Sequence, residues 1–228
     1  MAGAVRTSED TRRSGLALAP WALISGFAGI SANIFLVLFY IVAKPWQQGN
    51  DVGWFGRVND SLVVVQFAAM LLVMVALRQR MPTDRAAQVW TMVGVVSSAC
   101  VVVLQILLLT GVLPFSVQVT PVTLCILVVV WAVGAISRAG ARVNSLPVSV
   151  TRFGQLLALG LPAGALIFLL VMVFAWVVKL GSGTWVIGAL PGFLVWLAFP
   201  IWAVLLSRID ARTRLRGRPD GTTRWAAP

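Results

Sequence analysis

The sequence contains no histidine, and only seven of its 228 residues are acidic. Without histidine the chain lacks the commonest general base and the commonest neutral metal ligand, and a histidine-based hydrolytic triad is excluded. Its two cysteines, Cys100 and Cys125, fall in separate apolar runs and do not have the spacing of metal ligands. No glycine-rich fingerprint for nucleotide phosphates occurs. We therefore expect neither an enzyme nor a bound metal or organic cofactor.

Charged residues are also scarce, at 11% of the chain against about 25% in soluble domains. Hydrophobic residues make up 59%, and a soluble domain of this size cannot cover so much apolar surface. The surrounding solvent is therefore predicted to be lipid. Basic residues outnumber acidic ones by 18 to 7, but they lie in short segments between apolar runs. This pattern is typical of membrane topology signals rather than of nucleic-acid binding.

Six apolar runs are each long enough to cross a bilayer as a helix. They occupy about residues 20–43, 58–77, 87–112, 115–137, 155–178 and 185–206. None has the period-two alternation of a barrel strand, and a helix satisfies its own backbone hydrogen bonds in hydrocarbon. The predicted fold is all-α: a bundle of six transmembrane helices over residues 16–206, preceded by a disordered leader at 1–15 and followed by a basic tail at 207–228.

The basic residues predict the orientation of the chain. With the N-terminus in the cytoplasm, inner segments carry 15 of the 18 basic residues, and outer segments carry Lys44, Arg57 and Lys179. This positive-inside bias places both termini in the cytoplasm. Most tryptophans, Trp202 among them, lie near span ends as in interfacial belts, whereas Trp131 and Trp196 are expected to pack between helices.

No span interior contains Asp, Glu, Lys or Arg, which argues against an ion-coupled pump. The uncharged polar side chains of the spans fall mostly in the outer half, beneath the loop 50–60. One interpretation is that amides hydrogen-bond between helices and specify the bundle. The other is an outward-facing pocket for a neutral or amphipathic ligand, with Trp54 and Phe55 as a lid. The candidate ligand-binding residues are Asn33, Trp54, Asp60, Gln66, Gln105, Gln118 and Thr120.

Asp60, at the outer start of the second span, has two interpretations of its own. Asn59 or Asp60 can cap the N-terminus of that helix, where a negative charge is favoured by the helix dipole. Alternatively, Asp60 pairs with Arg57 or Lys179 and gates an outer cavity.

Two glycine motifs occur in the fifth and sixth spans. Gly160 and Gly164 (GLPAG) and Gly188 and Gly192 (GALPG) each form a small-xxx-small face. Proline within each motif, at Pro162 and Pro191, can kink the helix. The faces indicate close packing against neighbouring helices or, alternatively, a hinge or discontinuous helix at a transport site.

The tail carries six arginines between residues 208 and 224. They are expected to attract anionic lipids at the membrane surface, with docking of a cytoplasmic partner as the alternative. A homo-oligomer or a membrane partner is compatible with the glycine faces.

The segments GWFGRVND, SLVVVQF, ALRQRMP and TGVLPFSVQV resemble those of a set of uncharacterised bacterial six-span integral membrane proteins. These proteins share the pattern W-x-G-x-x-N-D at the start of their second helix. The resemblance implies the fold and a bacterial cytoplasmic (inner) membrane, but no activity. Two functions are therefore expected: binding or transport of a small neutral or amphipathic solute, or an accessory, regulatory or scaffold role beside a partner protein.

Overall fold

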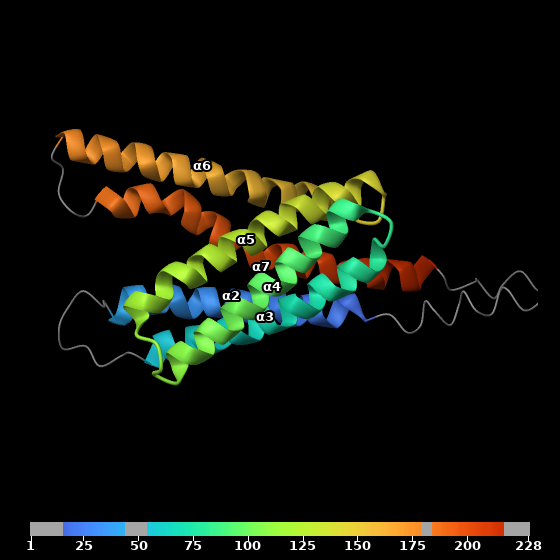
Figure 1. Ribbon diagram of the computed structural model, residues 1–228, viewed down its shortest axis with the longest axis horizontal. Helices are drawn as coiled ribbons and strands as arrows, with labels where there is room; N and C mark the ends of the chain where they lie inside the picture. The colour runs from blue at the N-terminus through green and yellow to red at the C-terminus, as the bar shows by residue number, and fades with distance from the viewer. Residues whose placement is uncertain (1–15, 44–53, 179–183, 217–228) are drawn as a thin grey trace, which may run out of the picture.

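The computed structural model describes residues 16–43, 54–178 and 184–216, and all of its regular elements are helical (Figure 1). Helix α2 continues at its C-terminal end into a single π-helical turn, η1. The elements are α2 (Leu18–Leu38), η1 (Phe39–Ala43), α3 (Trp54–Arg80), α4 (Arg85–Leu109), α5 (Phe115–Arg142), α6 (Val148–Val178) and α7 (Thr184–Arg216).

Six of these helices are long and apolar enough to cross a membrane, which confirms the predicted all-α, six-span fold. All six helices extend beyond their predicted spans at one end or both, because backbone hydrogen bonding within a helix does not stop at the edge of an apolar run. The extension at a single end is longest in α6 and α7. Helix α6 begins at Val148, and α7 continues to Arg216, well into the predicted tail. The predicted leader 1–15 and the tail beyond residue 216 lie outside the described residues.

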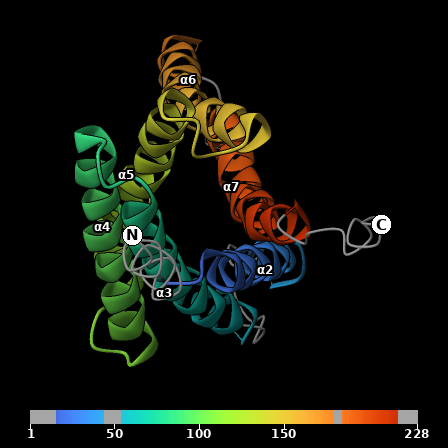
Figure 2. The same ribbon diagram turned by 90° about the vertical axis from the view of Figure 1, so that its right-hand side faces the viewer.

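The helices form a ring in chain order. Each packs against the helices before and after it, and α7 returns to pack against α2 (Figure 2). Short connections make sequential helices antiparallel. The α4–α5 connection contains Gly111 with φ of 74°, a left-handed conformation that glycine adopts without strain. The ring brings the first and the last described helices side by side.

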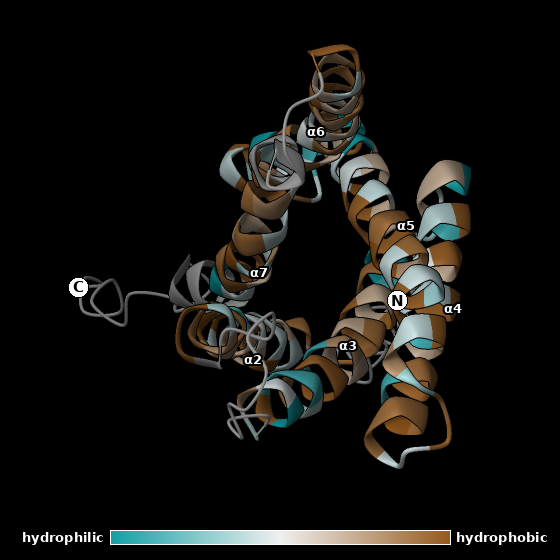
Figure 3. Ribbon diagram, turned by 90° about the vertical axis from the view of Figure 1, so that its left-hand side faces the viewer, coloured by the Kyte–Doolittle hydropathy of each residue, from teal (hydrophilic) through white to brown (hydrophobic). Residues whose placement is uncertain are grey.

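The ring is packed much more tightly in one half than in the other. We call the half beside the α3–α4 and α5–α6 connections the packed half, and the opposite half the loose half. Buried apolar side chains of α2, α6 and α7 cluster in the packed half, including Leu18, Val150 and Trp202. In the loose half of α6, residues 165–178, Ala175 is the single buried position. The helices are hydrophobic along most of their length (Figure 3), and many of their large apolar side chains are exposed, as expected for helices that face lipid.

Glycines allow close approach at several seams of the ring. A Cβ atom at Gly94 of α4 would lie 3.0 Å from the Met74 sulfur of α3, and one at Gly164 of α6 would lie 2.9 Å from the Gly192 nitrogen of α7. The predicted glycine faces of the fifth and sixth spans therefore contact each other. Pro162 and Pro191 both lie inside continuous helices, so neither helix is broken there.

Two tryptophans differ from their predicted surroundings. Trp202, expected in an interfacial belt, is completely buried where α5, α6 and α7 meet at Gly154. Trp131, expected between helices, is 43% exposed. Both helices are apolar on all sides, so hydropathy does not indicate which side faces the bundle.

The α3–α4 connection is fixed by side chains at the end of the packed half. Asp84 caps α4, because its Oδ1 accepts a hydrogen bond of 2.9 Å from the Ala87 nitrogen. Its Oδ2 lies 3.4 Å from Arg142 of α5. Gln88 donates to the carbonyl oxygens of Arg78 (2.8 Å) and Met81 (3.0 Å). These bonds hold α3, α4 and α5 together at this end.

The Asp84 contacts predict a pH-dependent stability. The hydrogen bond from the Ala87 nitrogen and the Arg142 charge hold the pKa of Asp84 below its usual value of about 3.9. Because the folded protein binds this proton more weakly than the unfolded chain, the stabilisation is present above that value and is lost as the pH falls through the folded pKa. Asp84→Asn keeps a good cap but removes the charge. We expect it to lower the melting temperature at pH 7, and we expect this loss to become smaller as the pH falls below about 3.9 towards the folded pKa. A loss that stays the same from pH 7 through this acid range would contradict the charge interaction.

Candidate functional site

The seven predicted site residues do not form a single cluster. Gln105 of α4 and Gln118 of α5 pair with each other, and the Gln118 Nε2 donates to the Gln105 Oε1 at 3.1 Å. Both side chains are buried between the two helices. This pair fulfils the interpretation that amides join helices. It does not line the groove described below.

Gln66 is buried in the middle of α3, against the α2–α7 seam. A Cβ atom at Gly29 of α2 would lie 2.6 Å from the Gln66 Nε2 and 2.7 Å from the Pro200 Cγ of α7. Gly29 therefore leaves the space that the Gln66 amide and the Pro200 ring share.

The remaining polar and aromatic candidates lie apart from both amides. Thr120 is exposed on the surface of α5. Trp54 is 53% exposed and stacks on Phe55 with ring centroids 3.9 Å apart, and both rings pack near Phe35 of α2. These rings form an aromatic cluster at the end of α2 and α3. They are not among the residues that line the groove described below, so the structure does not show them as its lid.

The predicted helix cap at Asn59 or Asp60 is wrong. Helix α3 begins at Trp54, five residues before Asn59, so both residues lie inside the helix. The Asn59 amide instead donates to the Asp60 carboxylate at 3.2 Å. Asp60 has no ion pair with Arg57 or any other described residue, and the proposed partner Lys179 lies outside the described residues.

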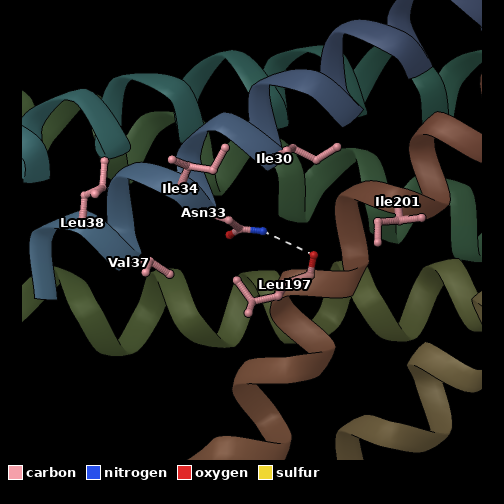
Figure 4. A pocket seen from close by; sticks show the side chains of 7 residues that line it. All are labelled: Ile30, Asn33, Ile34, Val37, Leu38, Leu197 and Ile201. Atoms are coloured by element: carbon pink, nitrogen blue, oxygen red, sulfur yellow. Dashed lines mark hydrogen bonds between the residues drawn. The ribbon is translucent and has the colours of Figure 1, made fainter. Parts of the chain in front are cut away.

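One of the seven candidates, Asn33, lines a groove between α2 and α7 (Figure 4). The groove has a volume of about 430 Å³, within the ~300–1,000 Å³ range of small-molecule sites. It is open to the surface, because Ile34 and Ile201 on its walls are 54% and 44% exposed. The lining residues are Ile30, Asn33, Ile34, Val37 and Leu38 of α2 with Leu197 and Ile201 of α7.

The position of Asn33 follows from the packing of α2 on α7. Gly26 and Gly29 bring α2 against the backbone and ring of Pro200, where a Cβ at Gly26 would lie 3.1 Å from the Pro200 oxygen. One turn further along α2, the Asn33 Nδ2 donates to the Leu197 oxygen at 3.4 Å. Proline at position 200 has no N–H for the Trp196 carbonyl, so this part of α7 is already weakened in its own hydrogen bonding. Asn33 thus joins α2 to α7 beside a proline.

The chemistry of the groove is that of a binding site with one polar group. Asn33 is 8% exposed, and its bond to Leu197 uses one N–H of the amide. A second N–H and the carbonyl oxygen remain to donate and accept hydrogen bonds. All other lining side chains are aliphatic. A charged ligand group would be desolvated there without a counter-charge.

Sequence reasoning found Asn33 but missed the α7 wall of this groove. The available signal was Pro200. The loss of a backbone hydrogen bond at this proline could be predicted from the sequence, but its contact with α2 could not.

No protein family, curated protein or solved structure matches this chain at a significant level. The resemblance to bacterial six-span proteins therefore stays a prediction. What the structure supports is the class: a helical, multi-pass membrane protein.

Proposed function

We propose that this multi-pass membrane protein binds a small neutral amphipathic molecule in the α2–α7 groove, as a step in passing it through the membrane. The observation that carries the proposal is a groove of about 430 Å³ with aliphatic walls and a single amide, Asn33. Aliphatic walls suit a hydrocarbon tail. The amide suits one alcohol, ester or amide group of the ligand. All three groups can accept a hydrogen bond from the Asn33 N–H, and alcohols and amides can also donate one to the Asn33 carbonyl oxygen.

The setting of the groove supports uptake from the bilayer rather than from water. The groove opens on the surface of helices that are long and apolar enough to be surrounded by lipid. It lies beside the loose half, where the helices have few buried side chains. The distribution of arginine supports an orientation in which the packed half of the ring faces the cytoplasm. Every described arginine side chain except Arg57 lies at the packed end of the helices. We place the protein in a bacterial cytoplasmic membrane on this basis and on the resemblance.

Photolabelling tests this proposal. The protein is reconstituted in liposomes with a long-chain alcohol that carries a diazirine in its chain, and labelled peptides are identified by mass spectrometry. Labels are expected on residues 30–38 and 197–201. Asn33→Leu removes one hydrogen bond of about 1 kcal/mol and should reduce this labelling by roughly fivefold, without affecting a diazirine alkane.

Thr123→Val is the matched control. Thr123 is also polar and lies in a span, but it is exposed and its hydroxyl bonds to its own helix, at the Val119 oxygen. It should leave labelling unchanged. Labels spread evenly over all helices, or alcohol labelling that survives Asn33→Leu in a protein of unchanged melting temperature, would contradict the proposal.

A second candidate function is that of an accessory subunit. It is favoured by the loose half of α6, where Leu170, Phe174 and Trp176 are between 59% and 83% exposed. A partner helix packed there would cover this surface. The glycines of α6 do not serve that purpose, because Gly164 is covered by α7 of the same chain. The photolabelling separates the two functions, since an accessory role requires no preference for the α2–α7 groove.

A further inference from the structure

Two polar groups face the same glycine where α5, α6 and α7 meet. Ser137 of α5 and Trp202 of α7 are both completely buried. A Cβ atom at Gly154 of α6 would lie 2.8 Å from the Trp202 Nε1, and it would also overlap the Ser137 hydroxyl oxygen. The indole N–H and the hydroxyl are therefore close neighbours, and they come together over a part of α6 that carries no side chain.

Neither of these two polar atoms has a hydrogen-bond partner within the described part of the chain. The buried hydroxyls of Thr91 and Thr151, by contrast, donate to backbone carbonyls of their own helices at 2.7 and 2.9 Å. An unpaired buried polar group is costly, and the great majority of such groups are paired with protein atoms or with ordered water. Two unpaired groups side by side therefore indicate a site for a molecule that can pair with both.

We propose that the Trp202 N–H and the Ser137 hydroxyl hold one buried water molecule between them. The indole N–H can only donate a hydrogen bond, whereas the hydroxyl can donate and accept. The water oxygen accepts from Trp202, and one water hydrogen is donated to the Ser137 oxygen. The hydroxyl hydrogen of Ser137 remains available for a carbonyl of its own helix. Such a bridge is nearly as favourable as a direct hydrogen bond, and ordering one water costs little entropy.

The surroundings favour water over other ligands. An ion would lose its hydration there without a counter-charge, because neither side chain is charged. An organic molecule would have to displace packed side chains, because both partners are completely buried. Neither residue lines the α2–α7 groove, so the water site does not rest on the proposed function.

The position of the site gives the water a role in closing the ring. Helices α5 and α6 pack together at the packed end and diverge toward the loose half (Figure 1). About one turn from the site, a Cβ atom at Gly134 of α5 would overlap the Ala158 side chain of α6. Close packing of small residues and a bridging water therefore act next to each other, and the water connects α5 to α7 beside this contact.

The test uses the full-length protein in lipid nanodiscs, with ¹⁵N in the indole ring of its tryptophans. The Trp202 signal is identified by its loss in Trp202→Phe. In the unaltered protein the indole hydrogen of Trp202 should show a dipolar cross-peak to a long-lived water. This signal should not move when sodium chloride is replaced by sodium sulfate.

Two serine variants test the second partner of the water. Ser137 and Ser98 are equally buried, and neither hydroxyl has a partner among the described residues. The register set by the Gln105–Gln118 hydrogen bond places Ser98 about 18 Å from Ser137 along the α4–α5 seam. Ser98→Ala is therefore the matched control, and it should keep the Trp202 cross-peak and the stability of the protein. Ser137→Ala should lose the cross-peak.

The stability of Ser137→Ala gives an independent measurement. Loss of one hydrogen bond to the water should lower the ratio of folded to unfolded protein roughly fivefold. Removal of an unpaired hydroxyl would instead leave this ratio unchanged or raise it, because alanine is the better helix former. The proposal is overturned if Trp202 shows no water cross-peak, if the cross-peak survives Ser137→Ala, if the signal shifts with chloride, or if Ser137→Ala is no more costly than Ser98→Ala.

Discussion

Replacing Gly164 with alanine is expected to destabilise the protein strongly, whereas the same change at Gly192, its contact across the seam, is expected to be harmless. A Cβ at Gly164 would lie 2.9 Å from the nitrogen and 3.1 Å from the Cα of Gly192, and 3.3 Å from the Pro191 carbonyl carbon. These are backbone atoms, so α6 and α7 must separate to make room. Overpacking of this kind costs about 1–3 kcal/mol, and Gly164→Val should cost more.

A Cβ at Gly192 would meet nothing within 4 Å. Gly192→Ala therefore serves as the matched control, and the higher helix propensity of alanine makes it neutral or slightly stabilising. Unfolding in detergent by added denaturant measures both changes. Equal costs at the two positions would show that the seam is not packed as described.

The second large effect concerns the amide pair between α4 and α5. Gln105→Leu leaves the Gln118 amide without its acceptor, and Gln118→Leu leaves the Gln105 oxygen without its donor. A buried polar group left unpaired costs about 1–3 kcal/mol. Because both amides are buried, we expect each single variant to be destabilised by an amount in that range.

The double variant, with leucine at both positions, removes both polar groups and should regain part of that loss. Interhelical hydrogen bonds in membranes couple by about 0.6–1.7 kcal/mol in such double-mutant cycles. The four proteins are compared by denaturant unfolding under the same conditions. Costs that simply add, with a double variant as unstable as the sum of the singles, would indicate that the two amides act separately.

The six spans and their order could be predicted because the hydrocarbon core of a membrane allows a chain few backbone conformations. A run of about 20 apolar residues must form a helix that bonds its own backbone, and short connections make sequential helices antiparallel. The side of each helix that faces its neighbours could not be predicted in this way. Trp131 and Trp202 show this: both lie in uniformly apolar runs, yet one is exposed and the other completely buried.

The same limit applies to the site. Depth along a helix predicted that polar residues would lie at similar levels, but not that Gln105 would meet Gln118 while Asn33 meets Leu197 on another seam. The depth of a residue along its helix follows from counting residues. Which neighbouring helix its side chain meets depends instead on the rotation of the helix and on small residues such as Gly29 that allow close packing.

The contact between α2 and α7 has a consequence for biosynthesis. Asn33 and its acceptor on Leu197 are 164 positions apart in the chain. Hairpins such as α3–α4 can assemble as soon as both of their helices leave the ribosome, but the face of α2 around Gly26 has no packing partner until α7 is made. In a chain that terminates before α7, this face of α2 would remain exposed to the bilayer. Such an incomplete product would expose to membrane proteases the surface that the finished protein conceals.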